Sequence, residues 1–162
     1  LGVRFGRYHI FLHKLIKPEP VSLRTLLWKN YHQKYFNLNP PTFGLNFIND
    51  DKIKNKNFML LCGFEKFDNI YVRIDILERL FMQIINSNSE KDKEIKMIPE
   101  MLNLLGCNKE SFKKLLVSMN YKIIDRENDT FFRYKPKKNF KKQNKKILKE
   151  TPFGVLKDLN FN

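Results

Sequence analysis

The part of the chain that decides the fold is residues 75–134, which read DILERLFMQIINSNSEKDKEIKMIPEMLNLLGCNKESFKKLLVSMNYKIIDRENDTFFRY. Its first turns repeat apolar residues at i, i+1, i+4, i+5, i+8 and i+9, beginning at Ile76 and ending at Ile85. This spacing predicts a helix with one wide apolar face. Asp75 is expected to cap that helix, and Glu78 would complete an arrangement close to a capping box.

Two shorter helices are predicted further along the same stretch. Pro99 suits the first turn of a helix, and Gly106 suits the position just after its end. Asn108 is a favourable cap for the next helix, whose apolar residues recur at helical spacing and should face inward. These residues are Phe112, Leu115, Leu116 and Met119.

Short extended runs accompany these helices. Ile95 and Met97 form one run, and residues 121–125 and 130–134 form two more, joined by a polar turn typical of a β-hairpin. The order helix, strand, helix, helix, hairpin is that of a winged helix-turn-helix. We therefore predict an α+β, mainly helical fold. A winged helix-turn-helix domain would be preceded by a small strand and helix segment and followed by a basic tail.

The N-terminal third carries further signals. Residues 3–12 predict a strand or strand pair broken at Gly6, and a helix is expected from about residue 20 to residue 35. A short helix over 57–62 and a strand over 70–74 should follow. The apolar stripe expected on the first of these helices is Val21, Leu23, Leu26, Leu27 and Tyr31, with Tyr35 at its end.

Changes in composition along the chain predict its organisation into parts. Pro, Gly, Asn and Asp gather between residues 37 and 56, which is typical of a surface loop. The predicted parts are 1–37 as an N-terminal strand and helix element, 38–56 as a linker loop, 57–134 as the winged-helix-like domain, 135–150 as a Lys-rich flexible linker and 151–162 as a short terminal docking helix.

The overall composition excludes several classes of protein. With 42% hydrophobic residues and 15 Phe, the chain is too apolar to be wholly disordered. Its longest apolar run, residues 58–64, is too short to span a membrane, so no membrane partner is expected. Cys62 and Cys107 offer neither a disulfide framework nor zinc-ligand spacing, which favours a reducing compartment. A reducing, intracellular setting is therefore expected.

The charge of the chain favours a polyanionic partner. Its 31 Lys and Arg exceed its 17 Asp and Glu, for a net charge of +14. The chain has no Ala and is rich in Lys and Asn, as AT-rich coding sequences produce, so part of this charge is background. The location of the charge is therefore more informative than its sum.

Residues 135–149 hold eight Lys and no acidic residue. Lysines in such a segment would bind a nucleic-acid backbone without reading its sequence, and a linker that promotes solubility is the alternative. The predicted contacts in this tail are Lys135, Lys137, Lys138, Lys141, Lys142, Lys145 and Lys146.

A second set of cations is predicted on the last helix and the hairpin. Lys109, Lys113 and Lys114 should lie on the outward side of the helix that follows Asn108, and in helix-turn-helix proteins this helix enters a groove of the nucleic acid. Arg126 and Arg133 would form a basic wing. The alternative is a charged face that serves only solvation. The nucleic-acid interpretation requires that these cations do not face carboxylates on the same molecule.

No catalytic or cofactor-binding pattern is present in the sequence. It contains no Gly-rich phosphate loop and no paired His or Cys motif of a metal site. We therefore expect no catalytic residue, no metal ligand and no cofactor in this chain, and no self-sufficient enzyme.

Several motifs resemble, in the same order, the region that follows the motor in one family of helicases. They are GVRFGR at 2–7, KP at 17–18, LLW at 26–28, VRIDILERL at 72–80, PEML and LLGC within 99–107, and PF with a following Leu within 152–156. The family is the mitochondrial RNA helicases of the Suv-three type and their alphaproteobacterial relatives, DExH-type motors of superfamily two. The resemblance leaves out the 37–56 loop and the Lys-rich stretch.

The resemblance implies that this chain is the C-terminal accessory part of an ATP-dependent RNA or DNA helicase, located in a bacterial cytoplasm or a mitochondrial matrix. The motor domains, which would hold ATP and Mg, are then on the parent protein and not in this chain. The implied partners are single-stranded or duplex nucleic acid, with RNA favoured, the motor domains of the same parent chain, and a nuclease.

Two alternatives stay open. One is a protein-interaction module that docks on the motor or a nuclease, helped by Phe153, Leu156 and Leu159. The other is a free-standing winged-helix DNA-binding protein.

Overall fold

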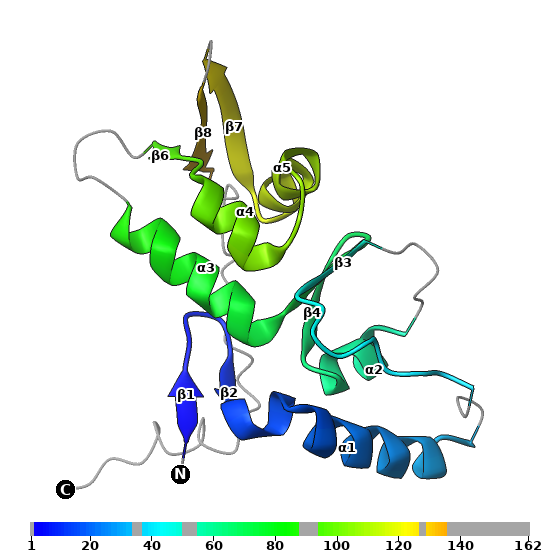
Figure 1. Ribbon diagram of the computed structural model, residues 1–162. Helices are drawn as coiled ribbons and strands as arrows, with labels where there is room; N and C mark the ends of the chain where they lie inside the picture. The colour runs from blue at the N-terminus through cyan, green and yellow to red at the C-terminus, as the bar shows by residue number, and fades with distance from the viewer. Residues whose placement is uncertain (1, 34–36, 50–54, 88–93, 127–128, 136–162) are drawn as a thin grey trace, which may run out of the picture.

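The computed structural model describes residues 2–33, 37–49, 55–87, 94–126 and 129–135. In this part the chain is an α+β protein, built from helices and three small antiparallel sheets (Figure 1). The elements are β1 (Val3–Phe5), β2 (Ile10–Leu12), the 3-10 helix η1 (His13–Ile16), α1 (Pro18–Tyr31), β3 (Phe47–Asn49), α2 (Lys56–Leu61), β4 (Phe64–Phe67), β5 (Ile70–Arg73), α3 (Ile74–Asn86), β6 (Ile95–Lys96), α4 (Pro99–Leu105), α5 (Lys109–Ser118), β7 (Tyr121–Arg126) and β8 (Asp129–Tyr134).

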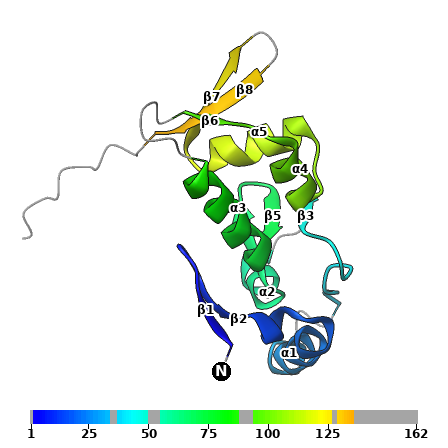
Figure 2. The same ribbon diagram turned by 60° about the vertical axis from the view of Figure 1, so that its left-hand side comes forward.

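The C-terminal part, from α3 to β8, packs three helices against a three-stranded sheet (Figure 2). The strand order is β6–β8–β7, and Phe132 of the central strand is fully buried opposite Ile95 and Ile123. The wide apolar face of α3 packs into the same core, which confirms the helix predicted there. The apolar residues predicted to face inward on α5 are all buried: Phe112, Leu115, Leu116 and Met119.

The turn between α4 and α5 follows from the local signals in the sequence. As predicted, α4 begins at Pro99 and ends before Gly106, whose φ of 70° lies in the left-handed region that favours glycine. The N–H of Gly106 donates to the carbonyl of Leu102 at 2.8 Å. The Asn108 side chain accepts a hydrogen bond from the N–H of Ser111 at 2.8 Å and so caps α5.

The middle of the chain forms a second sheet, in which the predicted linker loop takes part. Within 38–56, residues 47–49 form strand β3, which pairs with β5 in the register Phe47↔Val72. The prediction of a loop was wrong for these residues because three residues are too short a run to show strand alternation. The predicted short helix and strand are confirmed as α2 and β5, and β5 is the central strand between β3 and β4.

Helix α1 buries a different face from the one predicted. Its inward line is Val21, Thr25 and Trp28, and the Trp28 ring lies 5.3 Å from that of Phe58 on α2. Most of the predicted apolar stripe is more than half exposed instead: Leu23, Leu26, Leu27 and Tyr31. Periodicity placed these side chains together, but the neighbour of α1, helix α2, covers another side. Tyr35 lies outside the described residues.

The N-terminal hairpin contacts α3 through the Glu78 carboxylate and through the Tyr8 ring, whose centroid lies 4.6 Å from that of Phe81. Strands β1 and β2 pair antiparallel, which confirms the predicted strand pair. In the turn between them, the backbone N–H groups of Arg7, Tyr8 and His9 donate to the carboxylate of Glu78 at 2.6, 3.1 and 3.0 Å. We call this set of contacts the Glu78 anchor. It joins segments about 70 residues apart, and in Figures 1 and 2 the hairpin turn lies beside α3.

The anchor corrects the predicted capping box. Helix α3 starts directly after β5, its N-cap position is Arg73, and the Arg73 side chain does not cap it. Asp75 lies inside the first turn, where it accepts from the Arg73 guanidinium at 2.7 and 3.1 Å and from the N–H of Ile76 at 3.0 Å. The capping box is not formed because Asp75 is not the N-cap residue and because the Glu78 carboxylate accepts from the hairpin amides instead.

Among the described residues, no helix combines the length and the apolar content that crossing a bilayer requires.

Candidate nucleic-acid interface

The outward face of α5 carries the three lysines predicted for it, but they differ in their contacts. Lys109 and Lys114 are exposed and form no ion pair within the described part of the chain. Lys113 instead donates to both carboxylate oxygens of Asp125 on β7, at 2.7 and 2.8 Å. Hydrogen bonds from Lys113 and from the Thr130 hydroxyl lower the pKa of Asp125, so this carboxylate is ionised at neutral pH.

The predicted contact of Lys113 with nucleic acid stays a prediction, and it would require this ion pair to open. The Lys113 amine faces a carboxylate of the same molecule, which is the arrangement that the prediction excluded. The sequence could show that Lys113 points outward, but not that a strand from the hairpin would bring Asp125 to it.

The two arginines of the β7–β8 hairpin also differ in their contacts. Arg126 donates to Glu94 at 2.8 Å, and its guanidinium carbon lies 5.1 Å from the centre of the Phe131 ring. Its predicted contact with nucleic acid likewise stays a prediction that would require the Arg126–Glu94 pair to open. Arg133 is exposed, without an ion pair in the described residues, and stands directly across from Lys122 on β7. Two like charges in this position repel each other, and a bound phosphate would relieve that repulsion.

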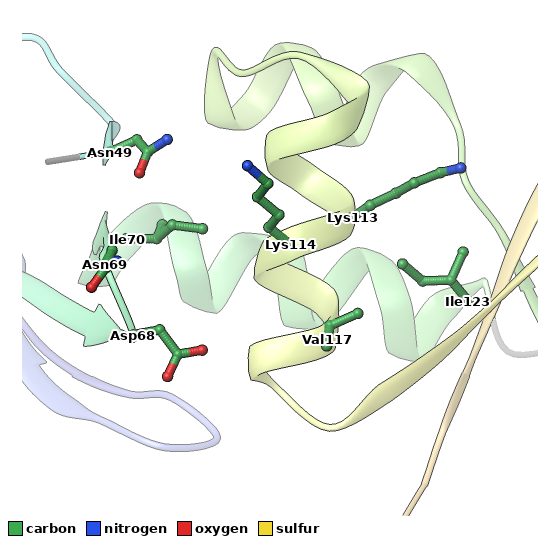
Figure 3. Close-up of a pocket in the computed structure, with 8 residues that line it drawn as sticks. All are labelled: Asn49, Asp68, Asn69, Ile70, Lys113, Lys114, Val117 and Ile123. Atoms are coloured by element: carbon green, nitrogen blue, oxygen red, sulfur yellow. The ribbon is translucent and has the colours of Figure 1, made fainter. Parts of the chain in front are cut away.

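A cleft with a volume of about 540 Å³ runs beside α5 (Figure 3). We call it the α5 cleft; it is lined by Asn49, Asp68, Asn69, Ile70, Lys113, Lys114, Val117 and Ile123. In Figure 3, Lys114 points from α5 toward the wall that carries Asn49, whereas Lys113 points to the other side of the helix. The Lys114 amine, which has no ion-pair partner among the described residues, thus lies at a cleft that is also lined by the amides Asn49 and Asn69 and by the carboxylate Asp68.

Three residues at this interface were missed by the sequence analysis. Lys122 could have been found, because strand pairing places it on the same face as Arg133. The amides Asn49 and Asn69 carry no such signal, since Asn49 reaches α5 through the pairing of β3 with β5 and Asn69 through the turn between β4 and β5. Lys135, the first residue of the basic tail, is exposed at the end of the described chain. The remaining tail lysines and Phe153, Leu156 and Leu159 lie outside the described residues.

The cysteine thiols are poor nucleophiles in this fold. Burial raises the pKa of Cys62 and that of Cys107 to about 11 each. Within the described ranges, His, Cys, Asp and Glu side chains form no group of three or more that would hold a metal ion.

The chain matches no protein-family model, no curated protein and no solved structure. The helicase resemblance therefore rests on the short sequence motifs alone, and the candidate site rests on the geometry of its own residues.

Proposed function

We propose that this chain is the C-terminal, nucleic-acid-holding accessory module of an ATP-dependent RNA or DNA helicase, with residues 74–134 as a winged helix. The order α3, β6, α4, α5, β7, β8 and the antiparallel sheet β6–β8–β7 support the winged-helix assignment. In it, α5 is the recognition helix and β7–β8 is the wing. The module acts by position: its cations hold the emerging strand near the motor and slow its dissociation.

The observation that carries the proposal is the exposed face of α5. Lys109 and Lys114 make no ion pair within the described residues, and Lys114 stands at a cleft whose lining includes the amides Asn49 and Asn69 and the carboxylate Asp68. Lysine is a point charge that binds phosphate without reading bases, so we expect little sequence preference. Lys122, Arg133 and Lys135, which are exposed and form no ion pair in the part of the chain that the structure describes, extend this surface along the hairpin.

We expect the double variant Lys109→Gln/Lys114→Gln to weaken binding of single-stranded RNA. Each lost contact with a phosphate lowers the slope of log affinity against log salt concentration by about 0.7, so two contacts give about 1.4. Fluorescence anisotropy with a labelled oligonucleotide over a salt series measures this slope. Lys113→Gln is the matched control on the same helix, and its slope should change less because its amine is held by Asp125. An unchanged slope in the double variant would contradict the role of α5.

We expect deletion of residues 135–149 to reduce the salt dependence further, by up to about 0.7 in slope for each lysine that contacts a phosphate. If the shortened chain keeps the full slope of log affinity against log salt concentration, the tail makes no phosphate contacts and acts only as a linker.

The same titrations separate the alternatives. Tight discrimination of one duplex sequence would indicate a free-standing DNA-binding protein. No binding of RNA or DNA by the complete chain would overturn the proposal and favour a module that only contacts proteins.

A second role, docking on the motor domains of the parent, is favoured by the N-terminal part. More than half of the exposed large hydrophobic side chains in the described residues lie between Val3 and Tyr31. Leu23, Leu27 and Tyr31 gather on one face of α1 with no cover from this chain's described residues. An apolar surface of this kind is typical of a contact with another domain.

A further inference from the structure

A second groove, between the β1–β2 hairpin and α3, has a lining that differs in kind from that of the α5 cleft. It has a volume of about 540 Å³ and is lined by Arg4 of β1, Arg7 of the hairpin turn and Arg79 of α3, and by no lysine. The chain contains 24 Lys and only 7 Arg. An AT-rich coding sequence raises the number of lysines, but it does not explain why three of the seven arginines line one groove. We take this clustering to indicate that the groove requires guanidinium groups and not only positive charge.

The oxygens of the two carboxylates in the groove are engaged by the protein itself. Asp75 accepts from the Arg73 guanidinium at 2.7 and 3.1 Å. Glu78 accepts from the three N–H groups of the hairpin turn, and the Nδ1 atom of His9 lies 3.2 Å from its Oε1. Both carboxylates are almost fully buried, so neither offers a free acceptor oxygen at the surface of the groove.

The three arginines, in contrast, are exposed and available. Arg4 and Arg79 make no hydrogen bond or ion pair within the described ranges, and the guanidinium carbon of Arg7 lies 5.8 Å from the centre of the Tyr8 ring. An arginine fork binds two oxygens of one phosphate at once, which a lysine cannot do. The groove is therefore suited to a ligand with phosphates.

We propose that this groove binds the backbone of single-stranded RNA, an inference that rests on the proposed function and adds a second contact to it. Phe5 lines the groove and is 79% exposed, so its ring offers a face on which an unpaired base stacks. A duplex keeps its base faces inside the helix and gains nothing from Phe5. Gln83 also lines the groove, and its buried Oε1 has no hydrogen-bond partner in the described residues. If the Gln83 side chain turns toward the groove, its Oε1 atom would accept a hydrogen bond from a ribose 2′-hydroxyl, a group that DNA lacks.

The test is anisotropy of the full chain with a labelled single-stranded RNA and the matching DNA over a salt series. The charge-removing variant is Arg4→Gln/Arg7→Gln/Arg79→Gln, the charge-keeping variant is Arg4→Lys/Arg7→Lys/Arg79→Lys, and the matched control is Lys14→Gln/Lys17→Gln/Lys29→Gln. Removing the three arginines should weaken RNA binding at least tenfold and lower the salt slope by about 2, that is, about 0.7 for each phosphate contact. The lysine variant should keep most of the slope but bind more weakly than the native chain, and the control should change affinity less than threefold.

A second variant tests stacking without touching charge. Phe5→Ala should weaken RNA binding about tenfold at an unchanged salt slope, with a smaller effect on duplex binding. Thermal melting of each variant verifies that it is folded. If native protein binds RNA and the arginine variant retains both affinity and slope, the groove serves another ligand, such as a protein, and this inference falls while the proposed function stands. If the native chain binds no nucleic acid, the proposed function fails first.

Discussion

Glu78→Ala should release the N-terminal hairpin from α3 while the C-terminal core stays folded. The N–H groups of Arg7, Tyr8 and His9 lose the carboxylate they donate to, and a hydrogen bond to a charged group contributes about 1.5–3 kcal/mol. That loss corresponds to about 10- to 100-fold faster exchange of these amides with solvent. Hydrogen exchange followed by NMR measures it residue by residue.

Gly6→Ala provides an independent route to the same state. A Cβ at Gly6 would overlap the side chain of Glu78, so the carboxylate would have to leave the turn. The two substitutions break one contact, so the double variant should exchange no faster than either single variant. Glu100→Ala, on the exposed first turn of α4, is the control and should leave the hairpin amides protected. Additive effects of Gly6→Ala and Glu78→Ala would show that the anchor is not what holds the hairpin.

Phe112→Ala should destabilise the C-terminal core by about 3–5 kcal/mol, the usual cost of truncating a buried Phe. The Phe112 side chain is fully buried, and its ring lies edge-on to that of Phe132 at 6.3 Å between centroids. A single domain is usually stable by only about 5–15 kcal/mol, so this one change removes a large part of the free energy of unfolding. Urea titration followed by circular dichroism gives the difference directly.

Val117→Ala is the matched control for Phe112→Ala. Val117 lies on the same helix, but its side chain is mostly exposed, so its truncation should change the free energy of unfolding by less than about 0.5 kcal/mol. Equal effects of the two substitutions would mean that α5 does not pack through Phe112.

What could be predicted from the sequence was local. Pro99, Gly106 and Asn108 each act within one turn of chain, and they placed both α4 and α5 correctly. Alternation alone does not explain the hairpin aromatics: Phe132 is fully buried, whereas Tyr134, two residues further on the same face of β8, is 50% exposed.

What could not be predicted depended on contacts between distant segments. Glu78 looked like a helix cap because its actual donors lie about 70 residues earlier in the chain. Lys113 looked free because its partner, Asp125, comes from another element. The stripe on α1 looked like core because periodicity shows which side chains share a face, but not whether anything covers that face.

The Glu78 anchor also imposes an order on synthesis. Arg7 is made 71 positions ahead of the carboxylate that holds its N–H. At a translation rate of about 5–20 residues per second, the hairpin leaves the ribosome roughly 4–14 s before its anchor. A two-stranded hairpin is marginal by itself in water, so the β1–β2 hairpin must wait for α3. Within this stretch of chain, the segment made earlier thus reaches its native position only after the later one has been made.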